Sequence, residues 1–296
     1  MVRGDKGKCS EPSYTVNTTY TSATDHPLEA AMALHLPSNG TLPLEMTSEQ
    51  PQPHSGLPSG TIALLVALLM TIPLLLSLRS EYRSFISLGP GGTPQTLAGF
   101  LRIYLLSFVK VTDPYKMPRS YAKTAQTTGF LGKVPQREGP RPETRGIAPH
   151  RQVTQQSNDT AYELLVAAIE HLSSSSPNLY IGTSCFEKHS SGLFALHPVN
   201  RTCGGEVCHT HPSDGGSLHL TLHPADVKTV LERGWGERHP LSRGGWFERF
   251  VPAGFVMVYA PRDPREVEIV AEVVRAAVWF VCCGEVVKSS CDAERA

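Results

Sequence analysis

The sequence carries no excess of charge of either sign. Its 296 residues include 27 Lys and Arg and 27 Asp and Glu, so the formal net charge is zero, and charged residues make up only 18%. Proteins that bind nucleic acid through its phosphates normally carry a basic excess or a basic face. We therefore expect no nucleic-acid partner.

Several chemical signatures are also missing. The sequence has no glycine-rich phosphate loop, no Walker motif and no G-x-S-x-G nucleophile elbow. Its seven cysteines are odd in number and irregularly spaced, which does not indicate a disulfide framework and favours a cytosolic location.

Low-complexity sequence occupies the N-terminal fifth. Residues 1–58 are rich in Ser, Thr, Pro and Gly, with no persistent apolar period, which predicts a disordered tail. The uncharged apolar run at 60–78 has about the length needed to cross a bilayer core, and its Pro73 is tolerated in a membrane helix. We therefore predict one transmembrane helix at 60–78; a buried hairpin or core helix is the alternative.

The charges around this run predict its orientation. Arg79 and Arg83 follow it, whereas Glu45 and Glu49 precede it. By the positive-inside rule, the C-terminal part then lies in the cytosol. We expect a single-pass membrane protein of the endoplasmic reticulum or another endomembrane.

Residues 79–126 are predicted to form a juxtamembrane segment. The apolar stretch at 97–110 is interrupted by Arg102, which favours a helix lying in the membrane interface. A first core helix or a second span are the alternatives. Residues 111–150, rich in Pro, Arg and Gly, are expected to wrap the surface of the domain that follows.

A regular pattern predicts a globular domain at 127–283, followed by a tail at 284–296. Apolar spacing and capping residues predict helices at 161–172, 224–233 and 264–281. Alternation and turn residues predict strands at 179–184, 192–197, 205–211, 217–223 and 255–260. This order indicates an α+β fold, a mostly antiparallel sheet with helices packed on one face.

One predicted hairpin, around the turn at 212–216, concentrates histidines. If it is symmetric, His209 faces His219 and His211 faces Ser217. Alternation puts Val207, His209 and His211 on the same face as His219, Thr221 and His223. The other face would bury Leu218, Leu220 and Leu222, and these leucines argue for this register.

These histidines allow more than one chemistry. His209, His211 and His219 could bind one metal ion, since imidazole is a common ligand for zinc, copper and iron. They could equally act as general bases and as donors to an oxyanion. A solvated histidine face with no chemical role is the third alternative.

Part of this region resembles the fungal luciferases. The similar residues are those at 218–241, with the block Gly234-Trp-Gly-Glu-Arg-His-Pro240, and those at 257–263, followed by an apolar, acidic helix. Shorter similarities at 137–142 and 186–189 come in the same order. The resemblance runs from about residue 60 to about residue 281 and marks 127–283 as a luciferase-like domain.

The resemblance implies an oxygen-dependent enzyme. Fungal luciferases add O₂ to 3-hydroxyhispidin, a hydroxylated α-pyrone, and the peroxide collapses with loss of CO₂. We expect O₂ as co-substrate, a small-molecule substrate and no bound cofactor, although a metal stays open. Such chemistry needs a base, donors for the oxyanion and a dry pocket.

Site residues follow from the positions that match. The catalytic candidates are His209, His211, His219, Glu187, His189 and His239. The substrate-binding candidates are Arg137, Arg141, Trp235 and Arg238, because a guanidinium can fork to two oxygens and an indole can wall a flat substrate. For Trp235, a place in the core is the alternative.

Departures from the family pattern affect luminescence first. The loop at 212–216 lacks a histidine that the luminous enzymes would carry, and the insert at 242–251 adds Trp246, Phe247 and Phe250. We therefore expect a luciferase-like oxygenase that emits no light. The alternatives are a non-catalytic, membrane-tethered histidine-rich module, or a hydrolase or decarboxylase that uses the same histidines.

Overall fold

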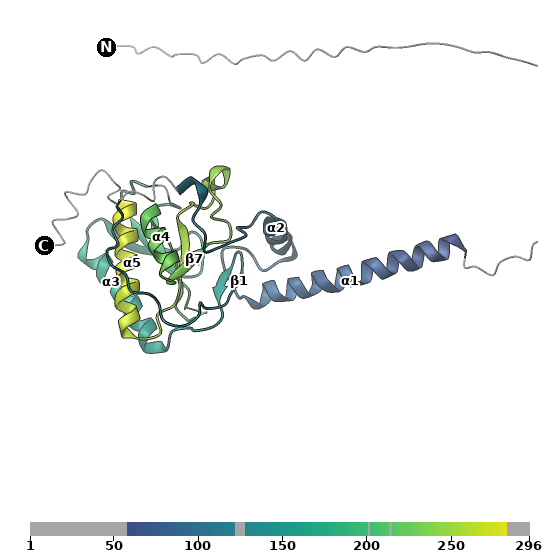
Figure 1. Cartoon of the computed structure of the whole chain (residues 1–296), viewed down its shortest axis with the longest axis horizontal. Coiled ribbons are helices and arrows are strands. Elements are labelled where there is room, and N and C mark those ends of the chain that lie inside the picture. The colour runs from purple at the N-terminus through teal and green to yellow at the C-terminus, as the bar shows by residue number, and fades with distance from the viewer. Residues whose placement is uncertain (1–57, 122–127, 201, 213–214, 283–296) are drawn as a thin grey trace, which may run out of the picture. The chain divides into compact units, whose positions relative to one another are not determined.

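The computed structural model describes residues 58–121, 128–200, 202–212 and 215–282 (Figure 1). The tails predicted at 1–58 and 284–296 lie outside these residues, except for Pro58. The described globular part has the predicted α+β fold, with a six-stranded antiparallel sheet in the order β3-β4-β5-β6-β8-β7. Its strands are β3 (Leu179–Thr183), β4 (Ser191–Ala195), β5 (Glu206–Thr210), β6 (Leu218–Thr221), β7 (Gly236–Arg238) and β8 (Phe255–Val258).

Three helices pack on one face of this sheet: α3 (Asp159–Ser175), α4 (Pro224–Glu232) and α5 (Pro264–Cys282). Asn158 begins α3 by accepting a hydrogen bond from the Ala161 N–H at 2.8 Å. Pro224 opens α4, and Gly234, at φ +75°, lets the chain turn away after it. Leu218, Leu220 and Leu222 are fully buried in the core that these helices cover, as predicted.

The predicted membrane segment is part of one long helix, α1 (Ser59–Ser87). It is long and apolar enough to cross a membrane, and its most apolar 18-residue window has no buried residue. Pro73 lies inside it. Whether α1 spans a membrane stays a prediction.

Helix α2 (Leu97–Ser107) has 11 residues, which rise only about 16 Å, so the alternative of a second span is wrong. Phe100 is buried and contacts the Tyr82 and Phe85 rings of α1 at 5.4 and 6.0 Å between centroids. Leu105 and Phe108 are exposed. One apolar face of α2 is therefore open, as an interfacial helix requires.

Three strands were not predicted. Residues 111–150, expected only to wrap the surface, contain β1 (Thr144–Gly146), which pairs with β2 (His150–Gln152) in a two-stranded ribbon. The third is β7, which pairs with β8 at the sheet edge. Each has only three residues, too few for a readable alternation.

Cysteine pairing also differs from expectation. Cys185 and Cys203 form a disulfide, although the cysteine count had argued against a disulfide framework. Cys208 and Cys282 are free. The cysteines therefore no longer support the predicted cytosolic location. That prediction now depends on the charges beside the predicted membrane segment.

We expect Leu220→Ala to lower the free energy of unfolding by about 2–5 kcal/mol, because Leu220 is fully buried beneath the helices. The matched control, Leu196→Ala, removes the same atoms from a side chain that is 51% exposed and should cost under about 0.5 kcal/mol. Urea unfolding followed by tryptophan fluorescence measures both. Equal losses would contradict the assignment of the core face.

Candidate functional site

Five histidine rings meet on the sheet face opposite the helices. His209 lies on β5 and His211 just after it, His219 lies on β6, His239 follows β7, and His150 begins β2. We call this set the histidine cluster: His150, His209, His211, His219 and His239, each between 1% and 7% exposed. The solvated face weighed as an alternative is therefore wrong.

The predicted register of the hairpin is confirmed. His209 pairs with His219 across β5 and β6, and the His211 N–H donates to the Ser217 carbonyl at 2.8 Å. Two members of the predicted face lie elsewhere. A bulge where β5 pairs with Leu193 and Phe194 turns Val207 into the core. His223 caps α4 by accepting from the Ala225 N–H, and its ring contacts Trp279.

The same bulge brings Glu206 onto the histidine face. Glu206 Oε1 lies 2.5 Å from His209 Nδ1. The carboxylate also accepts hydrogen bonds from the Ser184 hydroxyl at 2.8 Å and from the Cys185 N–H at 2.7 Å. Sequence reasoning missed Glu206, because regular alternation places it on the face opposite to His209.

His150 and Glu237 complete a second side of the cluster, and neither was predicted. His150 Nδ1 lies 3.2 Å from His219 Nε2, and His150 Nε2 lies 3.2 Å from Glu237 Oε1. The hydroxyls of Thr144 and Tyr259 donate to Glu237 at 2.8 and 2.9 Å. Burial by itself would raise the pKa of Glu237, but the hydrogen bonds from His150, Thr144 and Tyr259 and the proximity of His150 outweigh it and lower the pKa.

Burial keeps several of these rings neutral. The pKa values of His211, His219 and His239 are well below the usual 6.5, first because burial penalises the charged ring and then because neighbouring histidines repel a second charge. Neutral imidazoles can act as bases or as metal ligands. Phe255 covers the cluster by stacking on the His219 ring at 5.1 Å between centroids.

The remaining catalytic candidates do not join the cluster. Glu187 is buried and forms an ion pair with Arg151, which neighbours His150 in β2. His189 is exposed in the turn between β3 and β4. Glu187 thus borders the site through Arg151, whereas the geometry gives His189 no contact with the buried rings.

Two of the predicted substrate-binding residues, Arg141 and Arg238, form hydrogen bonds within the protein. Arg141 donates to the carbonyls of Leu231 and Gly236 at 2.5 and 2.9 Å. Arg238 donates to the carbonyls of Lys116 and Ser242. Guanidinium groups bound to backbone carbonyls in this way are committed to structure.

Arg137 and Trp235 lie together at another point of the domain. The Trp235 indole is 2% exposed, belongs to the core and donates to the Pro135 carbonyl at 2.8 Å, which favours the core alternative for it. The Arg137 guanidinium lies 6.0 Å from the Trp235 ring and 5.6 Å from the Tyr259 ring. Arg137 also donates a hydrogen bond to the Gln155 side chain at 3.0 Å. These contacts are all with other residues of the protein.

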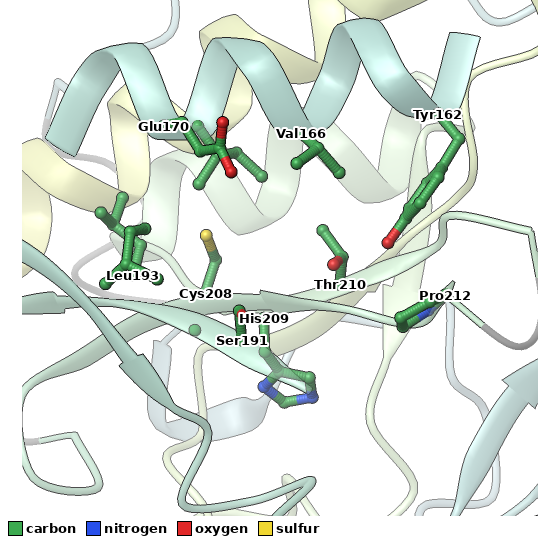
Figure 2. A pocket seen from close by; sticks show the side chains of 12 residues that line it. Tyr162, Val166, Glu170, Ser191, Leu193, Cys208, His209, Thr210 and Pro212 are labelled. Atoms are coloured by element: carbon green, nitrogen blue, oxygen red, sulfur yellow. The ribbon is translucent and has the colours of Figure 1, made fainter. Parts of the chain in front are cut away.

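Two cavities differ in their relation to the cluster. One, of about 130 Å³, lies between α3 and strands β4 and β5, where Tyr162, Val166 and Cys208 line it. His209 also borders it, but its ring points to the other side of the sheet (Figure 2). This cavity is therefore no route to the histidine rings.

The second cavity, of about 410 Å³, lies between α1, α2 and the β1–β2 loop. Tyr104, Gly146 and Ile147 are among its lining residues. Ile147 also forms a backbone hydrogen bond with the His239 ring. We call this space the α1/α2 cavity; it approaches the cluster from the side of α1.

Comparisons with known proteins point to one family. Residues 204–277 match the protein-family model of the luciferase domain. The luciferase of Armillaria ostoyae is 28% identical over 242 residues, covering 76% of this chain and 88% of the relative. The luciferase of Neonothopanus nambi is 29% identical over 220 residues, covering 69% and 81%. No solved structure matches the chain.

We expect the protein to lose stability steeply as the pH falls below about 6.5, where unfolded histidines take up protons. The buried rings of His211, His219 and His239 stay neutral, so the unfolded state binds more protons, and each ring contributes a slope approaching about 1.4 kcal/mol per pH unit. Urea midpoints at several pH values measure this slope. His239→Gln should reduce it by about a third, whereas a flat profile would show that the rings are protonated in the folded protein.

Proposed function

Because the chain is a relative of the luciferases of luminous fungi and carries a luciferase domain, we propose that it is an O₂-dependent oxygenase. Its proposed substrate is a hydroxylated α-pyrone or a related small aromatic metabolite. The observation that carries this proposal is the buried histidine cluster, since four of its five rings lie within the matched residues 204–277.

The cluster supplies what the first chemical step needs. An acidic enol that gives up its proton becomes an electron-rich anion, which can pass an electron to O₂ and then form a carbon–oxygen bond to the reduced oxygen. Ring nitrogens of the cluster that carry a lone pair accept the proton. The resulting peroxide breaks down with loss of CO₂, as the relationship to the luciferases implies.

Exclusion of water favours the same assignment. Phe186 and Phe255 contact each other at 4.6 Å between centroids and both lie against His209. A peroxide and an oxyanion last longer where water is excluded and the surrounding dipoles are fixed. A histidine face with no chemical role would leave its rings in water, because the desolvation of five imidazole rings costs free energy.

The α1/α2 cavity offers a route for the substrate. Its lining runs from Ser77 and Glu81 of α1 to Ile147, next to His239. Since α1 is the proposed membrane segment, a flat apolar metabolite dissolved in the bilayer would reach this opening directly. The cavity therefore supports a proposed approach of the substrate from the side of the cluster formed by His150 and His239.

We expect the full-length protein in mild detergent to consume O₂ when 3-hydroxyhispidin is added in air, and His209→Gln to lower the rate at least about 100-fold by removing one of the basic rings. The matched control is His197→Gln, which changes an exposed histidine outside the cluster and should leave the rate unchanged. An oxygen electrode, product mass and photon counting follow the reaction. No light is expected.

Three results would count against the proposal. If neither O₂ nor pyrone is consumed, the substrate class is wrong. If pyrone is consumed without O₂, the chemistry is that of a hydrolase or decarboxylase. Equal rates for His209→Gln and the control would remove the cluster from the mechanism.

A further inference from the structure

Three nitrogen atoms of the cluster converge on one point. His219 Nδ1 lies 3.3 Å from His209 Nε2 and 3.1 Å from His211 Nε2. In a tetrahedral site with metal–nitrogen bonds of about 2.0–2.1 Å, neighbouring ligand atoms are about 3.3–3.4 Å apart. Two of the three nitrogen–nitrogen distances are therefore close to the edge of a metal coordination tetrahedron, and the ligand atoms of all three rings lie within 4.8 Å of one another.

Hydrogen-bond partners assign the proton positions on one side of this point. The Thr144 and Tyr259 hydroxyls donate to Glu237, so its carboxylate acts as acceptor and takes the N–H of His150 Nε2. A neutral His150 then has a lone pair on Nδ1, which accepts from His219 Nε2. A neutral His219 is left with a lone pair on Nδ1, directed at the shared point.

The hydrogen bonds of Glu206 assign the proton position of His209 in the same way. Glu206 accepts from Ser184 and from the Cys185 N–H, so it also takes the N–H of His209 Nδ1. A neutral His209 then has a lone pair on Nε2. Two lone pairs thus face each other across 3.3 Å, which is repulsive unless a cation lies between them.

We infer that His209, His211 and His219 bind one divalent transition-metal ion. Each ring is oriented through its second nitrogen: His209 by Glu206, His211 by Ser217 at 2.9 Å, and His219 by His150. Metal-binding histidines are oriented by such partners in most known sites. The buried carboxylates of Glu206 and Glu237, both hydrogen-bonded to rings of the cluster, balance the charge of the ion.

A second set of three rings, His150, His219 and His239, also lies close enough to meet an ion. Its hydrogen bonds argue against it. His239 Nδ1 accepts from the Leu241 N–H at 3.1 Å, and the ring also bonds to the backbone of Ile147. Both nitrogens of His239 are therefore occupied, whereas the ring nitrogens of His209 and His219 that face the proposed ion are directed at each other.

Three imidazole ligands select borderline ions such as zinc, iron, cobalt or copper over magnesium and calcium, which prefer oxygen ligands. They leave the ion its full charge and at least one open position. If the proposed function holds, the hydroxyl oxygen of a 3-hydroxy-α-pyrone would bind at that open position, and an ion bound there would acidify the hydroxyl. The metal site itself does not depend on the identity of the substrate.

The test is the metal content of the full-length protein, purified in detergent through an affinity tag without histidine. Mass spectrometry should find about one transition-metal ion per chain. After exchange into Co²⁺, the visible absorption bands of four-coordinate cobalt should appear. His209→Gln and His211→Gln should lose both signals, His197→Gln should keep them, and His150→Gln should weaken binding about 10–100-fold.

A measurement on the wild-type protein tests the metal site even if the variants fail to fold. Chelation should lower the melting temperature of the wild-type protein and added Zn²⁺ should restore it, because a ligand of the folded state stabilises that state. A wild-type protein with neither bound metal nor cobalt bands would overturn the inference and leave a shared proton between the rings. Unchanged metal in folded His209→Gln would overturn it too. Neither outcome involves the substrate, so failure of the metal site and failure of the proposed oxygenase are separable.

Discussion

Two buried carboxylates, Glu206 and Glu237, hold the histidine cluster in one arrangement, and the chemistry of the site depends on them. Each accepts the N–H of one ring and is itself held by other donors. For an imidazole without such a partner, no hydrogen bond would offset the free-energy cost of desolvation. From one carboxylate, hydrogen bonds run to His209; from the other they run through His150 to His219, so the proton positions on each side are set by its carboxylate.

The sheet explains how these groups meet. The order β5-β6-β8-β7 brings residues from four strands to one face, and antiparallel pairing sets His209 opposite His219. Leucines on the other face of β6 lock this register into the core. Packing on one face of the sheet therefore positions the polar groups on the other.

Much of this could be predicted from the sequence, because alternation is local. The leucines of β6 reveal which residues share a face, and with them the pairing of His209 and His219. The bulge that moves Glu206 to the histidine face depends on β4, a strand from another part of the chain. His150 lies in a three-residue strand, and its contact with His219 spans 69 positions. No local pattern could reveal either.

The arginines show a similar limit. Arg141 and Arg238 were expected to bind substrate because a guanidinium suits oxygen anions, but tertiary structure offers them carbonyl oxygens instead. Likewise, the disulfide between Cys185 and Cys203 joins residues 18 positions apart that only the folded chain brings together. The residue type predicted the kind of interaction, whereas the partner depends on which groups the folded chain brings into contact.

The β1–β2 ribbon has a consequence for what counts as a functional unit. The luciferase-domain match covers residues 204–277, yet His150 reaches the cluster from β2, well before that match begins. A segment that could be mistaken for a linker therefore carries part of the site. A protein sharing only the matched region would have an incomplete set of rings, so shared domain content alone is a poor guide to shared chemistry. The similarity to the Armillaria ostoyae luciferase likewise extends over 242 residues, well beyond the matched region.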